Sequence, residues 1–161
     1  MIFAIAAILG LSAVCGKMIA LVYEKRDKFY EELETFCMFM KNEIGFCQTK
    51  AGMIFDKFVK IYNIKNFEAF KELKSCVENK NVSEQTSRNL YFLKQHEKQM
   101  IYNFFKNLGS LDENHQVADV ENFAEIIKKN HEEATGKRKQ NAPLCYKLCL
   151  AVGAVVCVMI L

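Results

Sequence analysis

The chain begins with a long apolar run. Residues 2–16 contain only apolar and small side chains, and after Lys17 the run resumes as far as Val22. This length is close to the ~20 residues that a helix needs to cross a bilayer, so the pattern predicts a transmembrane helix over residues 1–23. A cleaved signal peptide would need basic residues before the apolar run, and only Met1 precedes it. We therefore expect an uncleaved anchor.

A second apolar run lies at the other end of the sequence. Residues 144–161 contain a single charged residue, Lys147, and their number is near the lower limit for a spanning helix. Pro143 precedes them, and proline is favoured in the first turn of a helix because its missing N–H has no partner there. The pattern predicts a short transmembrane helix over residues 144–161, connected to the preceding domain by a basic linker over residues 137–143.

Between these runs, apolar residues recur at three- and four-residue steps, which is the period of amphipathic helices. The first stripe continues from the apolar run, because no Pro or Gly lies between Gly16 and Gly45, and it is expected to end near Gly45. A second stripe covers residues 54–62 and a third covers residues 67–77. The members of the first stripe are Phe29, Leu33, Phe36, Cys37, Met40, Ile44 and Cys47.

The segment after the third stripe is less regular. Ser83 is a suitable N-cap for a helix, but Glu97 interrupts the apolar stripe that follows it. The pattern therefore leaves open whether residues 83–108 form one helix or two. The stripe comprises Leu90, Leu93, Ile101, Phe104 and Leu108.

The start of the last helix is marked by its capping residues. Leu108 and Gly109 supply a stop for the preceding helix, and Ser110 and Glu113 have the spacing of a capping box. Asp112 would lie in the first turn, where its charge favours the helix dipole. The stripe of this helix comprises Val117, Val120, Ala124, Ile127, His131 and Ala134. We expect an all-α domain over residues 24–136, a bundle of about five or six helices.

Charged residues are concentrated in the middle of the chain. Of its 22 Lys and Arg and 19 Asp and Glu residues, all but Lys17 and Lys147 lie within residues 24–143. The net charge of +3, mixed in sign, gives no indication of nucleic-acid binding. Basic residues flank both apolar runs and, because such flanks stay in the cytoplasm, we expect the domain to face the cytoplasm. The flanking residues are Lys25, Arg26, Lys28, Lys137, Arg138 and Lys139.

The sequence offers no catalytic constellation. Its three His residues are isolated, neither HExxH nor CxxC occurs, and Gly136-Lys137 lacks the rest of a phosphate-binding loop. The seven Cys residues are odd in number and irregularly spaced, which indicates free thiols in a reducing compartment. We expect no enzymatic activity, no metal and no cofactor. A membrane-bound thiol enzyme that uses the cysteine-rich ends is the alternative from another class.

Short motifs recur along the whole sequence. Gly16 lies near the end of the first apolar run, the helix that follows carries Glu43-Ile44, and Gly153 lies in the second run. The most specific motif is the segment 104–116, in which an aromatic pair is followed by Leu-Gly, Asp and Gln. With these motifs the chain resembles the stage III sporulation protein AB family of endospore-forming Firmicutes. Cys149 takes the place of one family glycine.

The resemblance implies a fold and a function. The domain would be similar to the cytoplasmic domains of the F-type platform proteins of type II secretion and type IV pili. The protein would be a non-enzymatic subunit of the mother-cell-to-forespore membrane channel or secretion-like complex, in the membrane around the forespore, and would dock the complex's AA-type secretion ATPase. Its partners would be proteins of that complex, membrane lipid and a second copy of itself. A secretion or pilus platform subunit outside sporulation is the nearest alternative.

The resemblance also nominates residues for partner binding. Five of the matched residues have a folding role, in the core or at helix ends: Ile44, Leu108, Gly109, Ser110 and Asp112. Glu43 and Gln116 have no such role in the pattern, so we expect them to contact the partner. On this interpretation Glu43→Lys leaves folding intact and weakens ATPase binding.

Overall fold

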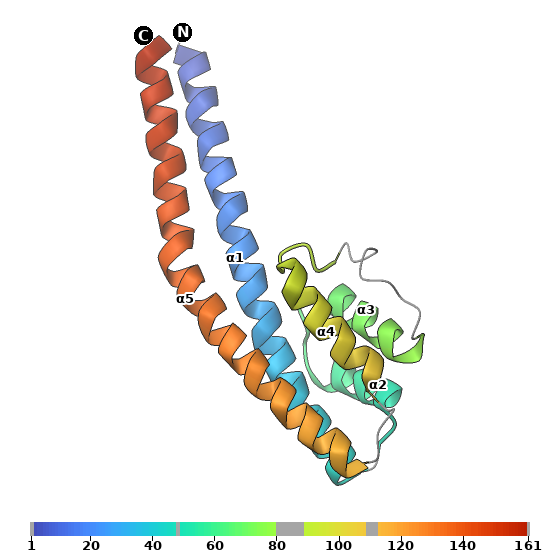
Figure 1. The fold of residues 1–161 in the computed structure, drawn as a ribbon. Coiled ribbons are helices and arrows are strands. Elements are labelled where there is room, and N and C mark those ends of the chain that lie inside the picture. The colour runs from blue at the N-terminus through green and yellow to red at the C-terminus, as the bar shows by residue number, and fades with distance from the viewer. Residues whose placement is uncertain (1, 48, 80–88, 109–112, 161) are drawn as a thin grey trace. The chain divides into compact units, whose positions relative to one another are not determined.

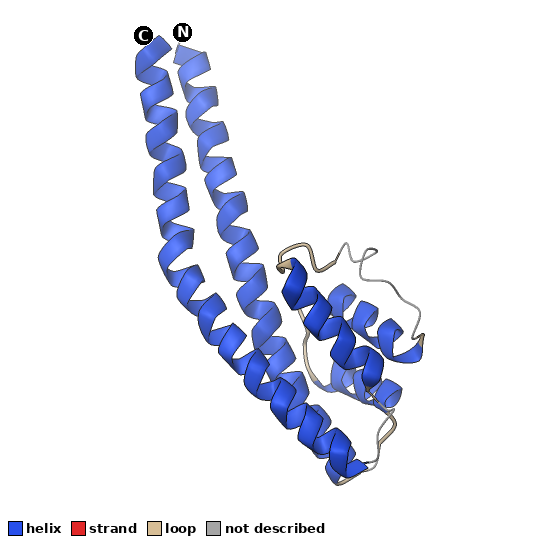
Figure 2. Cartoon of the chain, viewed as in Figure 1, coloured by secondary structure: helices blue, strands red, loops and turns tan. Residues whose placement is uncertain are grey.

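A computed structural model describes residues 2–47, 49–79, 89–108 and 113–160, and all regular secondary structure in these segments is helical, as Figure 2 shows. Two helices are long, α1 (Ile2–Gly45) and α5 (Glu113–Ile160) (Figure 1). Three shorter helices lie between them in the sequence: α2 (Ala51–Ile61), α3 (Phe67–Glu78) and α4 (Gln95–Asn107). The predicted all-α fold with two terminal apolar helices is confirmed.

The protein divides into two compact units. Met1–Asp27 and Glu132–Leu161 form the first, which we call the helix pair. Lys28–His131 forms the second, which we call the helical domain. Helices α1 and α5 each contribute residues to both units.

Small residues bring α1 and α5 close together in the helix pair. A Cβ atom on Gly16 would lie 3.1 Å from the Cα of Tyr146, and one on Gly153 would lie 2.8 Å from the Cβ of Ser12. The two termini lie side by side in Figure 1, so the helices run antiparallel. Close backbone approach at small residues is the usual way in which helices pack in a lipid environment.

The apolar side chains of the helix pair lie mostly on its outer surface. Leu11, Met18, Val152 and Val158 each expose more than half of their area. Both long helices contain a window that is long and apolar enough to cross a membrane, within Ala7–Gly45 and His115–Met159. Because water disfavours so much exposed apolar surface, the arrangement is consistent with a location in a membrane.

Helix α5 continues through Pro143, so the predicted basic linker and new helix at Pro143 are wrong. Proline inside a helix removes one backbone hydrogen bond and tends to bend or break the helix. Here α5 is held against α1 on both sides of the proline. Arg138 pairs with Asp27, and Tyr146 packs against Gly16. These contacts stabilise α5 as one helix.

The core of the helical domain is aromatic. Phe36 of α1 is fully buried, and its ring centroid lies between 4.5 and 6.1 Å from four other phenylalanine rings. These rings belong to α2, α3 and α4, so Phe36 of α1 contacts each of these three helices in the core. The four are Phe55, Phe58, Phe70 and Phe105.

The first predicted stripe is buried from Phe29 to Ile44. The prediction that Ile44 is a core residue is therefore confirmed. Cys47, which was expected to continue the stripe, is exposed because α1 ends at Gly45. Tyr62 and Phe67 expose 42% and 45% of their area, because they lie at the end of α2 and the start of α3. Helix ends thus limit how far each stripe extends.

The irregular segment before α4 is a turn followed by one helix. Leu93 donates its N–H to the carbonyl of Leu90 at 3.0 Å, and α4 begins only at Gln95. Glu97 interrupts the stripe because its buried carboxylate accepts the N–H of Lys94 at 2.9 Å and so caps the start of α4. The predicted N-cap Ser83 lies outside the described residues.

Candidate partner-binding surface

Helix α4 and the first turns of α5 enclose a shallow pocket on the helical domain. Its volume is about 180 Å³, which is smaller than the roughly 300–1,000 Å³ of sites for small molecules and cofactors. A side chain or a short piece of polypeptide fits such a space, whereas a nucleotide does not. The pocket is lined by Asn103, Phe104, Asn107, Leu108, Gln116 and Asp119.

Ring stacking fixes α4 against α5 beside this pocket. The ring of Phe104 stacks on that of Phe123 with a centroid separation of 3.7 Å and an interplanar angle of 2°. Phe105 packs edge-on against the same ring at 5.9 Å. Leu108 is the C-cap of α4, its N–H donates to the carbonyl of Phe104 at 3.0 Å, and its side chain is buried. The helix stop predicted at Leu108 is therefore confirmed.

The pocket brings together two of the residues that the family motif nominated. Leu108 and Gln116 line it from α4 and α5 respectively. Three further polar residues in the lining were not predicted, because an amide or carboxylate at an exposed helix position gives no signal in one sequence: Asn103, Asn107 and Asp119. The other nominated residues of this motif, which are Gly109, Ser110 and Asp112, lie outside the described residues.

Glu43, the other nominated residue, has a structural role that the sequence did not indicate. Its carboxylate accepts a hydrogen bond from the Thr49 hydroxyl at 2.6 Å and pairs with the Lys57 ammonium at 2.5 Å. The Thr49 N–H also donates to the Glu43 carbonyl at 3.1 Å. Glu43 therefore ties the connection after α1 to helix α2. Glu43 thus has structural contacts besides its predicted role in partner binding, and Glu43→Lys would place two ammonium groups together.

We expect Glu43→Gln to destabilise the helical domain by about 1 kcal/mol at neutral pH, because a charged hydrogen bond and an ion pair are lost. The hydrogen bonds from Lys57 and then Thr49 lower the pKa of Glu43 below its usual 4.5. A lowered pKa in the folded state contributes stability above the unfolded pKa and loses it as the pH falls through the folded pKa. In urea denaturation of the full-length protein in detergent, the unfolding midpoints of wild type and variant should therefore differ at pH 7 and coincide in acid.

The control is Glu125→Gln, at an exposed position of α5. A difference that does not depend on pH would contradict this role.

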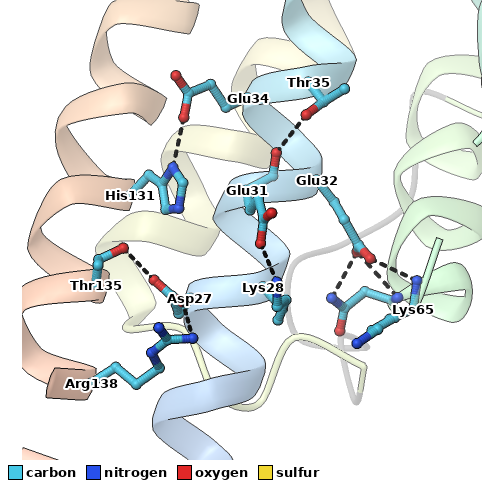
Figure 3. A network of polar contacts seen from close by, with 11 residues as sticks. Asp27, Lys28, Glu31, Glu32, Glu34, Thr35, Lys65, His131, Thr135 and Arg138 are labelled. Atoms are coloured by element: carbon cyan, nitrogen blue, oxygen red, sulfur yellow. Dashed lines mark hydrogen bonds and ion pairs between the residues drawn. The ribbon is translucent and has the colours of Figure 1, made fainter. Parts of the chain in front are cut away.

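Glu32 of α1 organises the connection between α2 and α3 (Figure 3). Its carboxylate accepts hydrogen bonds from the backbone N–H groups of Lys65 and Asn66 at 2.6 and 3.2 Å, and from the Asn66 amide at 2.8 Å. Asn66 is the N-cap of α3 and is buried. A carboxylate at this end of a helix also favours the helix dipole, so Glu32 fixes where α3 begins.

Three charged residues of α1 pair with residues of α5. The pairs are Asp27 with Arg138, Glu34 with His131 and Lys41 with Glu121, with N···O distances of 2.8, 2.7 and 2.6 Å. Figure 3 shows the first two of these pairs. The first lies in the helix pair and the other two lie in the helical domain. Successive members on α1 are seven residues apart and therefore share one face, an arrangement that sets the register of paired helices.

The cysteines of the helical domain differ in accessibility. Cys37 and Cys76 are buried, and Cys47 is exposed. Burial, with a smaller effect from Glu72, raises the pKa of Cys76 to about 11, and burial also raises the pKa of Cys37. Both buried thiols are therefore protonated at neutral pH and poor nucleophiles. Among the described segments there is no group of three or more His, Cys, Asp or Glu residues that could hold a metal ion.

These features define a small helical membrane-type protein, in which two apolar helices accompany a domain with its own core and a polar surface pocket. The family model for stage III sporulation protein AB matches residues 1–161, so the chain belongs to this family and has a role related to sporulation. Comparison with curated proteins gave no match, and comparison with solved structures gave none either.

Proposed function

We propose that the protein is a non-enzymatic interaction subunit of a sporulation membrane complex and docks the AA-type secretion ATPase of that complex at the membrane. The observation that carries this proposal is the contrast between the two units. The helix pair exposes apolar side chains, which suits hydrocarbon. The helical domain buries an aromatic core and presents amide and charged groups, which suit a soluble protein partner.

In this proposal the helical domain faces the mother-cell cytoplasm, where an ATPase has access to nucleotide. The support is the positive-inside rule, because basic residues follow the apolar part of α1 and precede that of α5. Some of them are paired with acidic residues, as Lys137 is with Glu133, but acidic neighbours contribute little to this rule. The mother-cell membrane around the forespore is the location that a sporulation role favours.

The docking proposal is tested by co-purification. The tagged full-length protein is co-expressed with the AA-type ATPase, solubilised in mild detergent and captured by its tag, and we expect the ATPase to be retained. Phe36→Ala, which removes the central side chain of the domain core, should release it. Phe46→Ala, at an exposed position next to α1, should not. Absence of the ATPase from the wild-type eluate, when the captured protein itself is well folded, would contradict the proposal.

A further inference from the structure

We infer that the surface around the connection between α2 and α3 is a contact site for anionic lipid headgroups of the bilayer. This inference goes beyond the proposed function, because it concerns how the helical domain meets the membrane and not how it holds an ATPase. The surface, which we call the basic apolar patch, consists of five exposed residues: Lys60, Ile61, Tyr62, Lys65 and Phe67.

The patch surrounds two adjoining hollows of the helical domain. One has a volume of about 420 Å³ and the other of about 200 Å³. The larger hollow is lined by Ile61 and Phe67, and Ile61 exposes 64% of its area. Tyr62 lines both hollows, and its ring is held at 4.6 Å from that of Phe58. Exposed apolar side chains that gather at one place, with polar groups around them, are typical of an interaction site.

The two lysines give the patch a positive charge. Lys60 lines the larger hollow and Lys65 lines the smaller one. Neither ammonium group has an ion pair or a hydrogen bond within the described part of the chain. Residues 57–67 contain three Lys and no Asp or Glu, and only Lys57 is paired, with Glu43. The charge of Lys60 and Lys65 is therefore available to an external anion.

The acidic residues in the lining of the smaller hollow already have partners. Glu31 pairs with Lys28 at 2.5 Å. Glu32 accepts the backbone N–H of Lys65 at 2.6 Å, as Figure 3 shows. Glu68, the next acidic residue along the chain, lines neither hollow. These carboxylates therefore offset little of the positive charge that the patch presents.

The combination of side chains favours a lipid surface as the ligand. Lys together with aromatic and aliphatic side chains is typical of segments that lie at a bilayer surface. There the apolar groups enter the boundary of the hydrocarbon, and the ammonium groups meet the phosphates of anionic lipid. A free anion would satisfy Lys60 and Lys65 but would leave Ile61 and Phe67 in water.

The chain itself keeps the patch near a bilayer. Lys28 of α1 lines the smaller hollow together with Tyr62 and Lys65. It follows Val22, the last residue of the first apolar run, by six residues. Six residues span at most about 22 Å even when fully extended. A membrane that holds the apolar run is therefore present at a high effective concentration.

The test uses tryptophan fluorescence, because the chain contains no Trp and one introduced Trp reports only its own surroundings. Full-length Ile61→Trp is placed in lipid nanodiscs whose acyl chains carry bromine, a quencher of Trp, near the headgroup. We expect quenching when phosphatidylglycerol makes up about one third of the phosphatidylcholine bilayer, and its loss without phosphatidylglycerol or in about 0.5 M sodium chloride. Phe46→Trp, at an exposed position outside the patch, is the matched control and should not be quenched.

The role of charge is tested by Lys60→Gln combined with Lys65→Gln in the Ile61→Trp protein. Each Lys near an anionic surface favours contact about fivefold, so the two changes should weaken contact about 25-fold and remove most of the quenching. Lys50→Gln combined with Lys106→Gln makes the same change of charge at exposed positions outside the patch, and it should preserve the quenching. Protection of Cys37 from maleimide verifies that each variant is folded.

Three results would overturn the inference. The first is an unquenched Ile61→Trp in anionic nanodiscs in which Val152→Trp, in the apolar part of α5, is quenched. The second is quenching that is equal in both kinds of nanodisc or unchanged by removal of the two lysines. The third is release by sodium phosphate that exceeds release by sodium chloride at equal ionic strength, which would indicate a site for free phosphate.

The inference and the proposed function can fail independently. Quenching is measured without the ATPase, and retention of the ATPase is measured by co-purification in detergent. If Ile61→Trp is not quenched and the two lysine changes together release the ATPase, then the patch binds a protein, and the inference fails while the proposed function stands. If Ile61→Trp is quenched as expected and the wild-type protein retains no ATPase, the reverse holds.

Discussion

Phe36→Ala is expected to destabilise the helical domain by about 3–5 kcal/mol, the usual cost of removing a buried phenylalanine. The side chain is fully buried and its ring contacts rings of α2, α3 and α4, so the cavity would lie where four helices meet. Because a domain is typically stable by only 5–15 kcal/mol, the substitution should remove a large part of the domain's free energy of unfolding.

Urea denaturation of the full-length protein in detergent, followed by maleimide reaction of the buried Cys76, measures this loss. Cys76 lies on α3 and therefore reports opening of the domain rather than the local change at position 36. Phe46→Ala removes the same side chain at a position that is 87% exposed, and it should change stability by no more than about 0.5 kcal/mol. Equal effects of the two substitutions would contradict the proposed core.

Gly153→Leu is expected to disrupt the helix pair. Even a Cβ atom at this position would clash with the Oγ of Ser12 and lie 2.8 Å from its Cβ. Rotation of the Ser12 side chain can move the Oγ but not the Cβ, so the two helices must separate. Overpacking of this kind costs about 1–3 kcal/mol, which for a protein of this size lowers the melting temperature by roughly 2–12 °C.

Thermal unfolding of the full-length protein in detergent tests this expectation. Gly10→Leu adds the same side chain to α1 where a Cβ would meet nothing within 4 Å, and it should leave the melting temperature unchanged. Gly153→Ala adds only the clashing Cβ atom and should also lower the melting temperature. Ser12→Gly removes the atoms that this Cβ meets, so adding it to Gly153→Ala should restore most of the lost stability. If Gly10→Leu were as harmful as Gly153→Leu, the close approach of α1 and α5 could not be the cause.

The helices of the domain can be predicted from the spacing of apolar residues alone. The stripe from Phe29 to Ile44 is buried along its length, and α2 and α3 lie close to the stripes that predict them. Such spacing is informative because each amphipathic helix buries its own face. Such spacing is less informative beyond the helix ends. Cys47 continues the stripe but is exposed, and Leu90 and Leu93 are buried although they lie in a turn rather than in a helix.

The roles of the acidic residues could not be predicted in the same way. Glu43 and Glu32 accept hydrogen bonds from residues 6 and 34 positions away, so their partners are known only once the helices have packed. Pro143 was a misleading signal, because the contacts that hold α5 together around it come from α1. Long-range contacts decide both cases, and a linear pattern does not contain them.

The lining of the candidate partner-binding surface was predicted only in part. Of the residues that line the pocket, Gln116 was predicted to contact a partner and Leu108 was predicted to end a helix. The amides of Asn103 and Asn107 carry no pattern that distinguishes them from other exposed polar residues. Their alignment depends on how α4 packs against α5. The pocket is therefore a property of the packed domain rather than of one segment.

The central claim is that the helical domain faces the cytoplasm, where an ATPase can reach it. The most direct test uses the full-length protein with Cys47 as its single cysteine, expressed in non-sporulating cells and treated with a membrane-impermeant maleimide. Cys47 is the right probe because it is exposed, whereas Cys37, the matched control, should react only after denaturation. Labelling of Cys47 only after the cells are permeabilised is the predicted result. Labelling in intact cells would place the helical domain outside the cytoplasm and would contradict the docking of a cytoplasmic ATPase.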